Sequence, residues 1–129
     1  MKLKTLFSIY AVVAALFCVG LLLMPAFWIT LYGAHADSQA TVLLRLVGAL
    51  MGGLAIMSYV GRNAEPSRLR DAIVLGFIVS NGLAAIVAVS GAVTGAYNQF
   101  AWGPVVTFAS FAIGFQWVGR AGVSADVPN

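Results

Sequence analysis

The chain contains 129 residues, of which 61% are hydrophobic and 9% are charged, and its formal net charge is +3. Because soluble domains carry about 25% charged residues, this composition excludes an ordinary water-soluble domain and predicts an integral membrane protein. The few basic residues form no dense face with interleaved aromatic rings, so a nucleic-acid partner is also excluded.

The first apolar run covers residues 6–24 and is long enough to cross a bilayer as one helix. Lys2 and Lys4 precede it, as basic residues precede the apolar core of a signal peptide. The run is longer than a usual signal-peptide core, and no small-residue cleavage site stands before Pro25. We therefore expect an uncleaved first span.

Residues 26–32 predict a short amphipathic turn that lies along the outer membrane interface. Phe27, Trp28 and Tyr32 are aromatic residues of the kind that gathers at the level of the lipid headgroups. A second apolar run, over residues 41–60, follows this turn and predicts the second span.

The third span is expected over residues 72–93, with Asp71 as its N-cap, and the fourth over residues 103–119, with Pro104 in its first turn. The polar tail at residues 121–129 is expected to fray. Lipid offers no partner to an exposed backbone amide, so each span should be helical. The predicted fold is an all-α bundle of four transmembrane helices, formed by the whole chain as one domain.

Basic residues fall at one end of each apolar run. They are Lys2 and Lys4 before the first run, Arg62, Arg68 and Arg70 between the second and third, and Arg120 after the fourth. The connections at residues 32–41 and 95–103 contain no Lys or Arg. Because short loops rich in these residues stay on the cytoplasmic side, both termini are expected to be cytoplasmic. The expected location is the inner (cytoplasmic) membrane.

Small residues recur within the spans at the four-residue spacing that brings helices into close contact. Helices in lipid associate through close packing and hydrogen bonds, so small residues mark candidate contact faces. The candidates are Gly48 and Gly52 in the second span and Gly76, Ser80, Ala84 and Ala88 in the third. Packing within one chain is the favoured interpretation. In the alternative, one stripe, expected on the second span, faces a second copy or another membrane subunit.

Two polar residues inside the spans are the candidate functional residues. Arg45 lies about 6 Å below the outer start of the second span. It is expected to reach the interface, to contact an anion, a headgroup or a partner, or to bind loop carbonyls. Asn81 lies near the membrane midplane, where Thr107 or Ser110 of the fourth span, or an Asn of another copy, is the expected partner. Structural hydrogen bonding is favoured over a transport site for Asn81.

The sequence contains no cluster of His and Cys residues with metal-ligand spacing and no carboxylate at mid-depth in a span. It also contains no recognisable set of nucleophile and general base. We therefore expect no catalytic residue, no metal site and no cofactor.

Residues around the first outer connection and the second span support a resemblance. They stand in the order Pro25, Leu31-Tyr32-Gly33, Leu44-Arg45-Leu46-Val47-Gly48-Ala49 and Gly52-Gly53. With them the chain resembles small bacterial four-helix membrane proteins of unknown function that are DoxX-like in outline. The resemblance implies an accessory subunit of a respiratory or redox complex. It marks Arg45 as a candidate and implies no catalytic residue.

The expected function is therefore that of a non-catalytic multi-pass membrane protein. It would act as an accessory or interaction subunit through helix–helix packing, in contact with the lipid bilayer and with a second copy or other membrane subunits. The alternative is a small oligomeric transporter or channel that uses Arg45 and Asn81. A wet cavity between these two side chains would favour transport, and a dry seam would favour packing.

Overall fold

The computed structural model describes residues 2–123, with side chains up to residue 119, and all regular structure in this range is helical. The elements are α1 (Leu3–Leu23), α2 (Pro25–Leu31), α3 (Ser38–Gly61), α4 (Arg68–Val93), the 3-10 helix η1 (Gln99–Ala101) and α5 (Trp102–Val123). Four helices of the described range, α1, α3, α4 and α5, are long and apolar enough to cross a membrane. The predicted all-α class with four helices of spanning length is confirmed.

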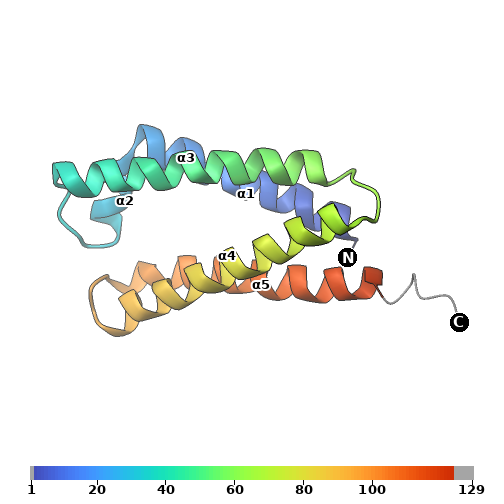
Figure 1. Cartoon of the computed structure of the whole chain (residues 1–129). Helices are drawn as coiled ribbons and strands as arrows, with labels where there is room; N and C mark the ends of the chain where they lie inside the picture. Colours follow the sequence, from blue (N-terminus) through green and yellow to red (C-terminus); the bar gives the residue numbers. More distant parts are fainter. Residues whose placement is uncertain (1, 124–129) are drawn as a thin grey trace, which may run out of the picture.

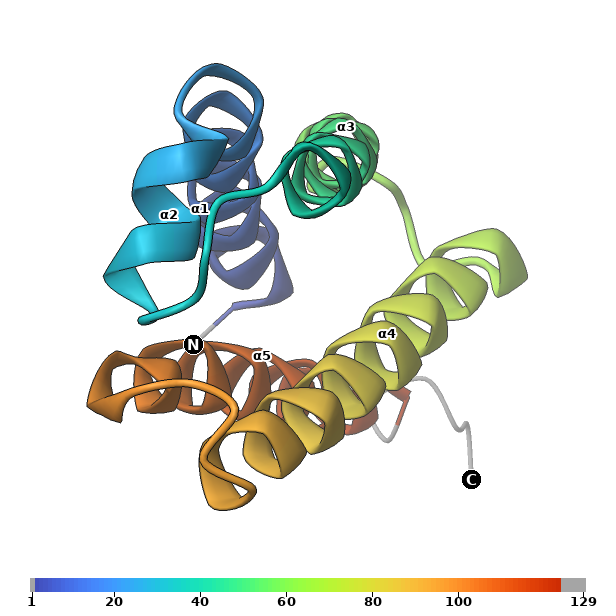
Figure 2. The ribbon, with the colours of Figure 1, turned by 90° about the vertical axis from the view of Figure 1, so that its left-hand side faces the viewer.

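The four long helices form two antiparallel hairpins. Helix α1 packs along α3, and α4 packs along α5. Figures 1 and 2 show the hairpins as two layers, with α3 and α4 approaching each other only near their connection. The layers meet mainly through α1 and α5. We call the end with residues 62–67 and the start of α1 the basic end, and the opposite end the loop end.

The helix starts follow from local capping. Asp37 Oδ1 accepts a hydrogen bond from the Ala40 backbone N–H at 2.7 Å, so α3 begins three residues before the expected span. The Ser67 hydroxyl caps α4 by accepting from the Arg70 N–H at 3.2 Å. The prediction of Asp71 as this cap is wrong: Asp71 lies in the first turn, where its negative charge suits the helix dipole.

The last helix is longer than the expected fourth span, because it starts at Trp102 and continues to Val123. Residues 121–123, which were expected to belong to a frayed tail, are helical. The remainder of that tail, residues 124–129, lies outside the described residues.

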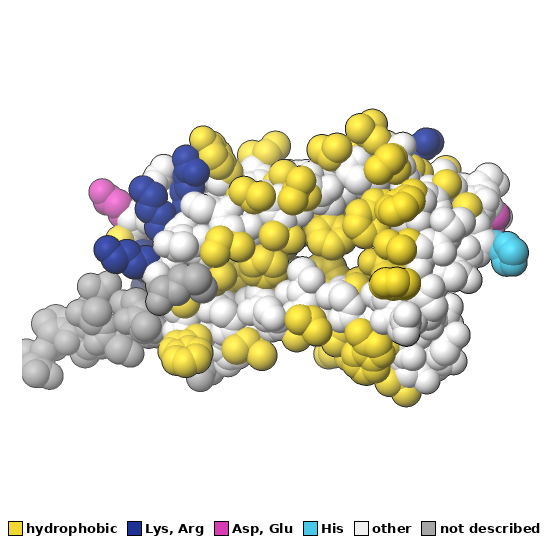
Figure 3. Space-filling view, turned by 180° about the vertical axis from the view of Figure 1, so that it is seen from behind, with side chains coloured by type: hydrophobic (Ala, Val, Ile, Leu, Met, Phe, Trp, Pro, Cys, Tyr) yellow, Lys and Arg dark blue, Asp and Glu magenta, His cyan; other side chains and the backbone are white. Residues whose placement is uncertain are grey.

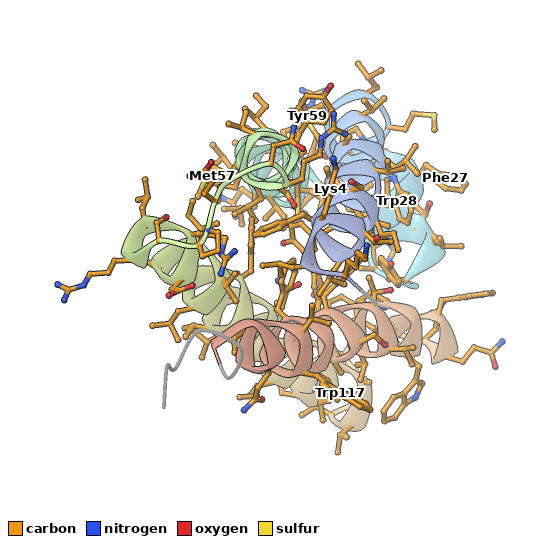
Figure 4. All side chains as sticks on the ribbon, turned by 90° about the vertical axis from the view of Figure 1, so that its right-hand side faces the viewer. Lys4, Phe27, Trp28, Met57, Tyr59 and Trp117 are labelled. Atoms are coloured by element: carbon orange, nitrogen blue, oxygen red, sulfur yellow. The ribbon has the colours of Figure 1, made fainter. Side chains whose placement is uncertain are left out.

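The expected interfacial turn is the short helix α2, with Pro25 at its first position, where the missing N–H costs no hydrogen bond. Trp28 folds back onto α1, and its indole nitrogen lies 2.8 Å from the position that a Cβ would take at Gly20. Phe27 points away from α1, as Figure 4 shows. Helix α2 therefore uses one aromatic side chain for packing and leaves another on the outer surface.

The loop end is closed by hydrogen bonds between the two outer connections. The Asn98 backbone N–H donates to the Tyr32 carbonyl at 3.0 Å, and the Asn98 side chain donates to the Leu31 carbonyl at 2.8 Å. Gly33, with φ of 81°, makes the turn that brings these groups together. Helix α2 thus links the two hairpins at this end.

An aromatic cluster links the hairpins in the interior. Phe7 and Tyr10 come from α1, Phe77 from α4, and Phe111 and Phe115 from α5. The ring centres of Tyr10 and Phe111 are 4.7 Å apart at an interplanar angle of 85°, and those of Phe7 and Phe77 are 5.7 Å apart. Such edge-to-face pairs add stabilisation of about 0.5–1.5 kcal/mol each beyond area burial. The cluster holds α1 against the second hairpin.

The outer surface of the long helices is apolar. Leu16 of α1, Leu50 of α3, Ile86 of α4 and Ile113 of α5 are each more than 60% exposed. Figure 3 shows hydrophobic side chains along the flank of the molecule and most of the visible basic side chains at one end. Soluble proteins rarely expose so much apolar surface, so these helices fit a multi-pass membrane protein.

Candidate functional site

Asn81 is the most deeply buried polar candidate, with 1% of its surface exposed. Its Nδ2 donates to the Phe77 carbonyl of its own helix at 2.8 Å and to the Tyr10 hydroxyl of α1 at 3.3 Å. The Asn81 side chain therefore connects the two hairpins where α1 crosses α4, at the edge of the aromatic cluster.

The expected partners of Asn81 in the fourth span were wrong. The Thr107 hydroxyl donates to the Gly103 carbonyl of its own helix at 2.9 Å, and Ser110 is exposed on the surface of α5. The Asn81 side chain is enclosed by the described residues of its own chain, and the expected Asn of a second copy stays a prediction. Depth in the membrane can be read from position along a helix, but the partner depends on how each helix is rotated.

A small cavity lies beside Asn81 between the hairpins. It measures about 10 Å³ and is lined from all four long helices, among others by Tyr10, Met51 and Thr107. One water molecule needs at least about 10–15 Å³. The other lining side chains are apolar: Val13, Ala14, Phe17, Phe108 and Phe111. Asn81 therefore lies in a seam of mainly apolar side chains, where its Oδ1 lacks a hydrogen-bond partner among the described residues, and the cavity has room for about one water molecule.

Arg45 is separate from this seam. Its side chain is exposed on α3, and the residue does not line the cavity beside Asn81. In the described part of the chain it makes neither a side-chain hydrogen bond nor an ion pair, so the expected bond to loop carbonyls is absent there. The structure does not bring Arg45 and Asn81 together.

Gly48 and Gly52 of α3 face α1. A Cβ added at Gly48 would lie 3.0 Å from Leu21 Cβ and 3.2 Å from the Leu22 backbone nitrogen. A Cβ added at Gly52 would lie 2.9 Å from Cys18 Sγ. These distances are shorter than ordinary van der Waals contact. A Cβ at Gly48 would meet backbone that cannot move away, whereas a Cβ at Gly52 would require the Cys18 side chain to shift. This glycine face is covered within the chain, and the alternative of a partner on it is not supported.

The small residues of α4 divide into two groups. Gly76 and Ser80 are exposed, and a Cβ added at Gly76 would meet nothing within 4 Å, whereas Ala84 and Ala88 are half-buried. The buried line of the helix is formed by Val74, Phe77 and Asn81. Because four residues advance an α-helix by about 40° more than one turn, a strict four-residue stripe drifts off the contact line.

Ser58 of α3 is a buried polar residue that sequence reasoning missed. It is 0% exposed, and its hydroxyl donates to the Phe7 carbonyl of α1 at 2.8 Å. Ser58 continues the buried small-residue line of Gly48 and Ala55 at helical spacing. That continuation is the signal in the sequence that would have identified it.

Comparison with known proteins gives one match. A family model described as a domain of unknown function (DUF8292) matches residues 1–119. No curated protein matches the chain, and no solved structure matches it. The matched segment contains the Asn81 seam, the covered glycine face of α3 and the exposed small residues of α4.

Proposed function

The chain belongs to the DUF8292 family, and we propose that it is a non-catalytic membrane protein that acts as an accessory or interaction subunit through helix–helix packing. Its partners would be a second copy or other membrane subunits. The observation that carries this proposal is the pair of small-residue faces. The face on α3 is already covered by α1, whereas Gly76 and Ser80 on α4 have open space in front of them.

The open face of α4 is the proposed contact surface. Between helices in lipid, close approach of backbones is the main source of association, and glycine permits the closest approach. Ser80 adds a hydroxyl, which donates to the Phe77 carbonyl at 3.3 Å and keeps its lone pairs free to accept. A partner helix that lies along Gly76 and Ser80 would bury surface that otherwise faces acyl chains.

A transporter or channel that uses Arg45 and Asn81 is the weaker proposal. Asn81 is engaged by Tyr10 and Phe77 in a seam whose cavity measures about 10 Å³. Arg45 stands apart on the outer surface of α3. Among the described residues, Arg45 does not line the cavity beside Asn81, so the two side chains share no common pocket there.

We also propose that both termini face the cytoplasm and that the protein lies in the inner membrane. The support is the gathering of Lys2, Lys4, Arg62, Arg68 and Arg70 at the basic end, because basic short loops are retained on the cytoplasmic side. We propose as well that the chain is DoxX-like and serves as an accessory subunit of a redox complex. This proposal rests on the residues between Pro25 and Gly53.

The packing proposal is tested with Gly76→Leu and the matched control Val93→Leu, which changes a side chain that is 71% exposed on the same helix and lies about 100° around the helix axis from Gly76. Size-exclusion chromatography with light scattering in mild detergent would measure the mass of the assembly and of any co-purifying subunits. Gly76→Leu should reduce assembly without lowering the melting temperature, because no neighbour within the chain is displaced. A wild-type monomer without partners, or equal assembly in both variants, would contradict the proposal.

A further inference from the structure

The basic end of the molecule carries cationic side chains that the proposed packing role does not use. They are Lys2, Lys4, Arg62, Arg68 and Arg70, and the carboxylates nearby in the chain are Glu65 and Asp71. Among the described residues the only ion pair joins Arg70 to Asp71, at 3.7 Å, and the Asp71 side chain is 55% exposed. An exposed pair this long contributes little. Most of the positive charge at this end therefore has no counter-charge within the described residues.

Two of these arginines are held differently from the others. The Arg62 guanidinium carbon lies 3.9 Å from the centre of the Tyr59 ring, a cation–π contact that fixes the side chain. The Arg70 side chain is only 15% exposed. The Nε atoms of both are buried and lack a hydrogen-bond partner among the described residues, although buried polar atoms are nearly always paired. Arg68, by contrast, is exposed.

The position of Arg62 defines what can reach it. It is the C-cap of α3, directly after a membrane-spanning length of helix, and its neighbours Tyr59 and Val60 are 56% and 69% exposed. The surface around Arg62 is apolar and aromatic on one side and cationic on the other. Such a surface is typical of the level at which acyl chains meet headgroups. Figure 4, which looks onto the basic end, shows Tyr59 and Lys4 on the hairpin of α1 and α3.

We infer that Arg62 forms a contact site for the phosphate of an anionic phospholipid headgroup. A planar guanidinium offers donors in a fork that matches phosphate oxygens, and the Tyr59 stack holds that fork before the lipid arrives. The phosphate group also occurs as a free ion. The lipid is the assigned source because the adjoining Tyr59 and Val60 surface suits acyl chains and not a hydrated ion. The inference does not depend on the proposed packing partner.

A headgroup site differs measurably from general attraction to an anionic membrane. General attraction acts on every cation near the surface, so Arg62→Gln and Arg68→Gln would then weaken binding equally. A site adds charge-assisted hydrogen bonds at Arg62 that Arg68 lacks. Arg62→Gln should therefore weaken binding about tenfold more than Arg68→Gln does.

The experiment is native mass spectrometry of the full chain in detergent, titrated with phosphatidylglycerol and, separately, with phosphatidylcholine. Wild type should bind phosphatidylglycerol preferentially, Arg62→Gln should lose that preference, and Arg68→Gln should keep most of it. Tyr59→Phe should bind like wild type because the ring remains, and Tyr59→Leu should bind less.

Folding is controlled by the melting temperature of each variant in phosphatidylcholine alone. If Arg62→Gln melts lower there, Arg62→Lys, which keeps the charge but loses the fork, replaces it and should retain only part of the preference. Equal losses in Arg62→Gln and Arg68→Gln, or no preference in wild type, would overturn the site. Competition by millimolar inorganic phosphate would overturn the lipid as its ligand.

Discussion

The small-residue faces of α3 (Gly48 and Gly52) and α4 (Gly76 and Ser80) have the same four-residue spacing and opposite surroundings. Gly48 and Gly52 on α3 lie against α1 so closely that an added Cβ would come within 3.0 Å of α1 side-chain atoms. Gly76 on α4 has nothing within 4 Å of the same added atom. The comparison shows that small-residue spacing marks a capacity for close approach, and that the neighbouring helix decides whether the chain itself uses it.

Gly48→Leu should lower the stability of the protein more than any of the other variants. The side chain would collide with Leu21 and with the Leu22 backbone, which cannot rotate away. Overpacking of this kind should lower the free energy of unfolding by about 3 kcal/mol. Unfolding in mixed detergent micelles measures the loss. The matched control is Gly53→Leu, because a Cβ at Gly53 meets nothing within 4 Å; equal losses in the two variants would refute the covered face.

Gly52→Ala should lower the stability less than Gly48→Leu, and Cys18→Ala should restore most of what is lost. The added Cβ would lie 2.9 Å from Cys18 Sγ, with the next Cys18 atom at 3.9 Å. We expect a loss of about 1 kcal/mol for Gly52→Ala. The loss should largely disappear when Gly52→Ala is combined with Cys18→Ala, because the colliding sulfur is then removed. A double-mutant cycle of melting curves measures this coupling, and additive losses would argue against the contact.

Ser58→Ala probes the polar part of the contact between α3 and α1. It removes the hydrogen bond from the Ser58 hydroxyl to the Phe7 carbonyl at 2.8 Å. Interhelical hydrogen bonds in membranes contribute about 0.6 kcal/mol on average, so the free energy of unfolding should fall by about that amount. Ser90→Ala is the control, since the Ser90 hydroxyl bonds only within α4. An equal loss of stability in Ser90→Ala would mean that the effect comes from a serine-to-alanine change within a helix and not from the hydrogen bond between α3 and α1.

Gly76→Leu should change stability least. No neighbour within the chain is displaced, and leucine favours the helix over glycine by up to about 1 kcal/mol. The free energy of unfolding of the monomer should therefore stay the same or rise slightly. A fall of the size expected for Gly48→Leu would mean that the α4 face is covered within the chain.

The sequence predicts the parts of this structure that depend on the membrane alone. Apolar runs of spanning length identified the four long helices, because lipid demands internally bonded backbone. Local caps shifted the helix starts. With Ser67 as its N-cap, α4 begins at Arg68, four residues before the expected residue 72. These shifts come from single side-chain hydrogen bonds, which hydropathy does not register.

The candidate site was less predictable, because it depends on the rotation of each helix. Asn81 was correctly singled out as a polar group that needs a partner, but its partner Tyr10 comes from α1, 71 residues away in the chain. Gly76 and Ser80 shared the sequence spacing of Ala84, and the drift of that spacing around the helix turned them outward. Which helix lies opposite a residue follows from tertiary packing and not from local pattern.

The most direct test of the covered face is disulfide formation in membranes, with the native Cys18 of α1 as one partner. Gly52→Cys places a second thiol on the facing position of α3, with the two Cβ atoms 3.9 Å apart, near the separation of about 3.8 Å that a disulfide requires. After oxidation and proteolysis between the helices, the fragments of a single chain should stay joined. A disulfide between chains, or none at all, would contradict the covered face of α3 and the account of packing built on it.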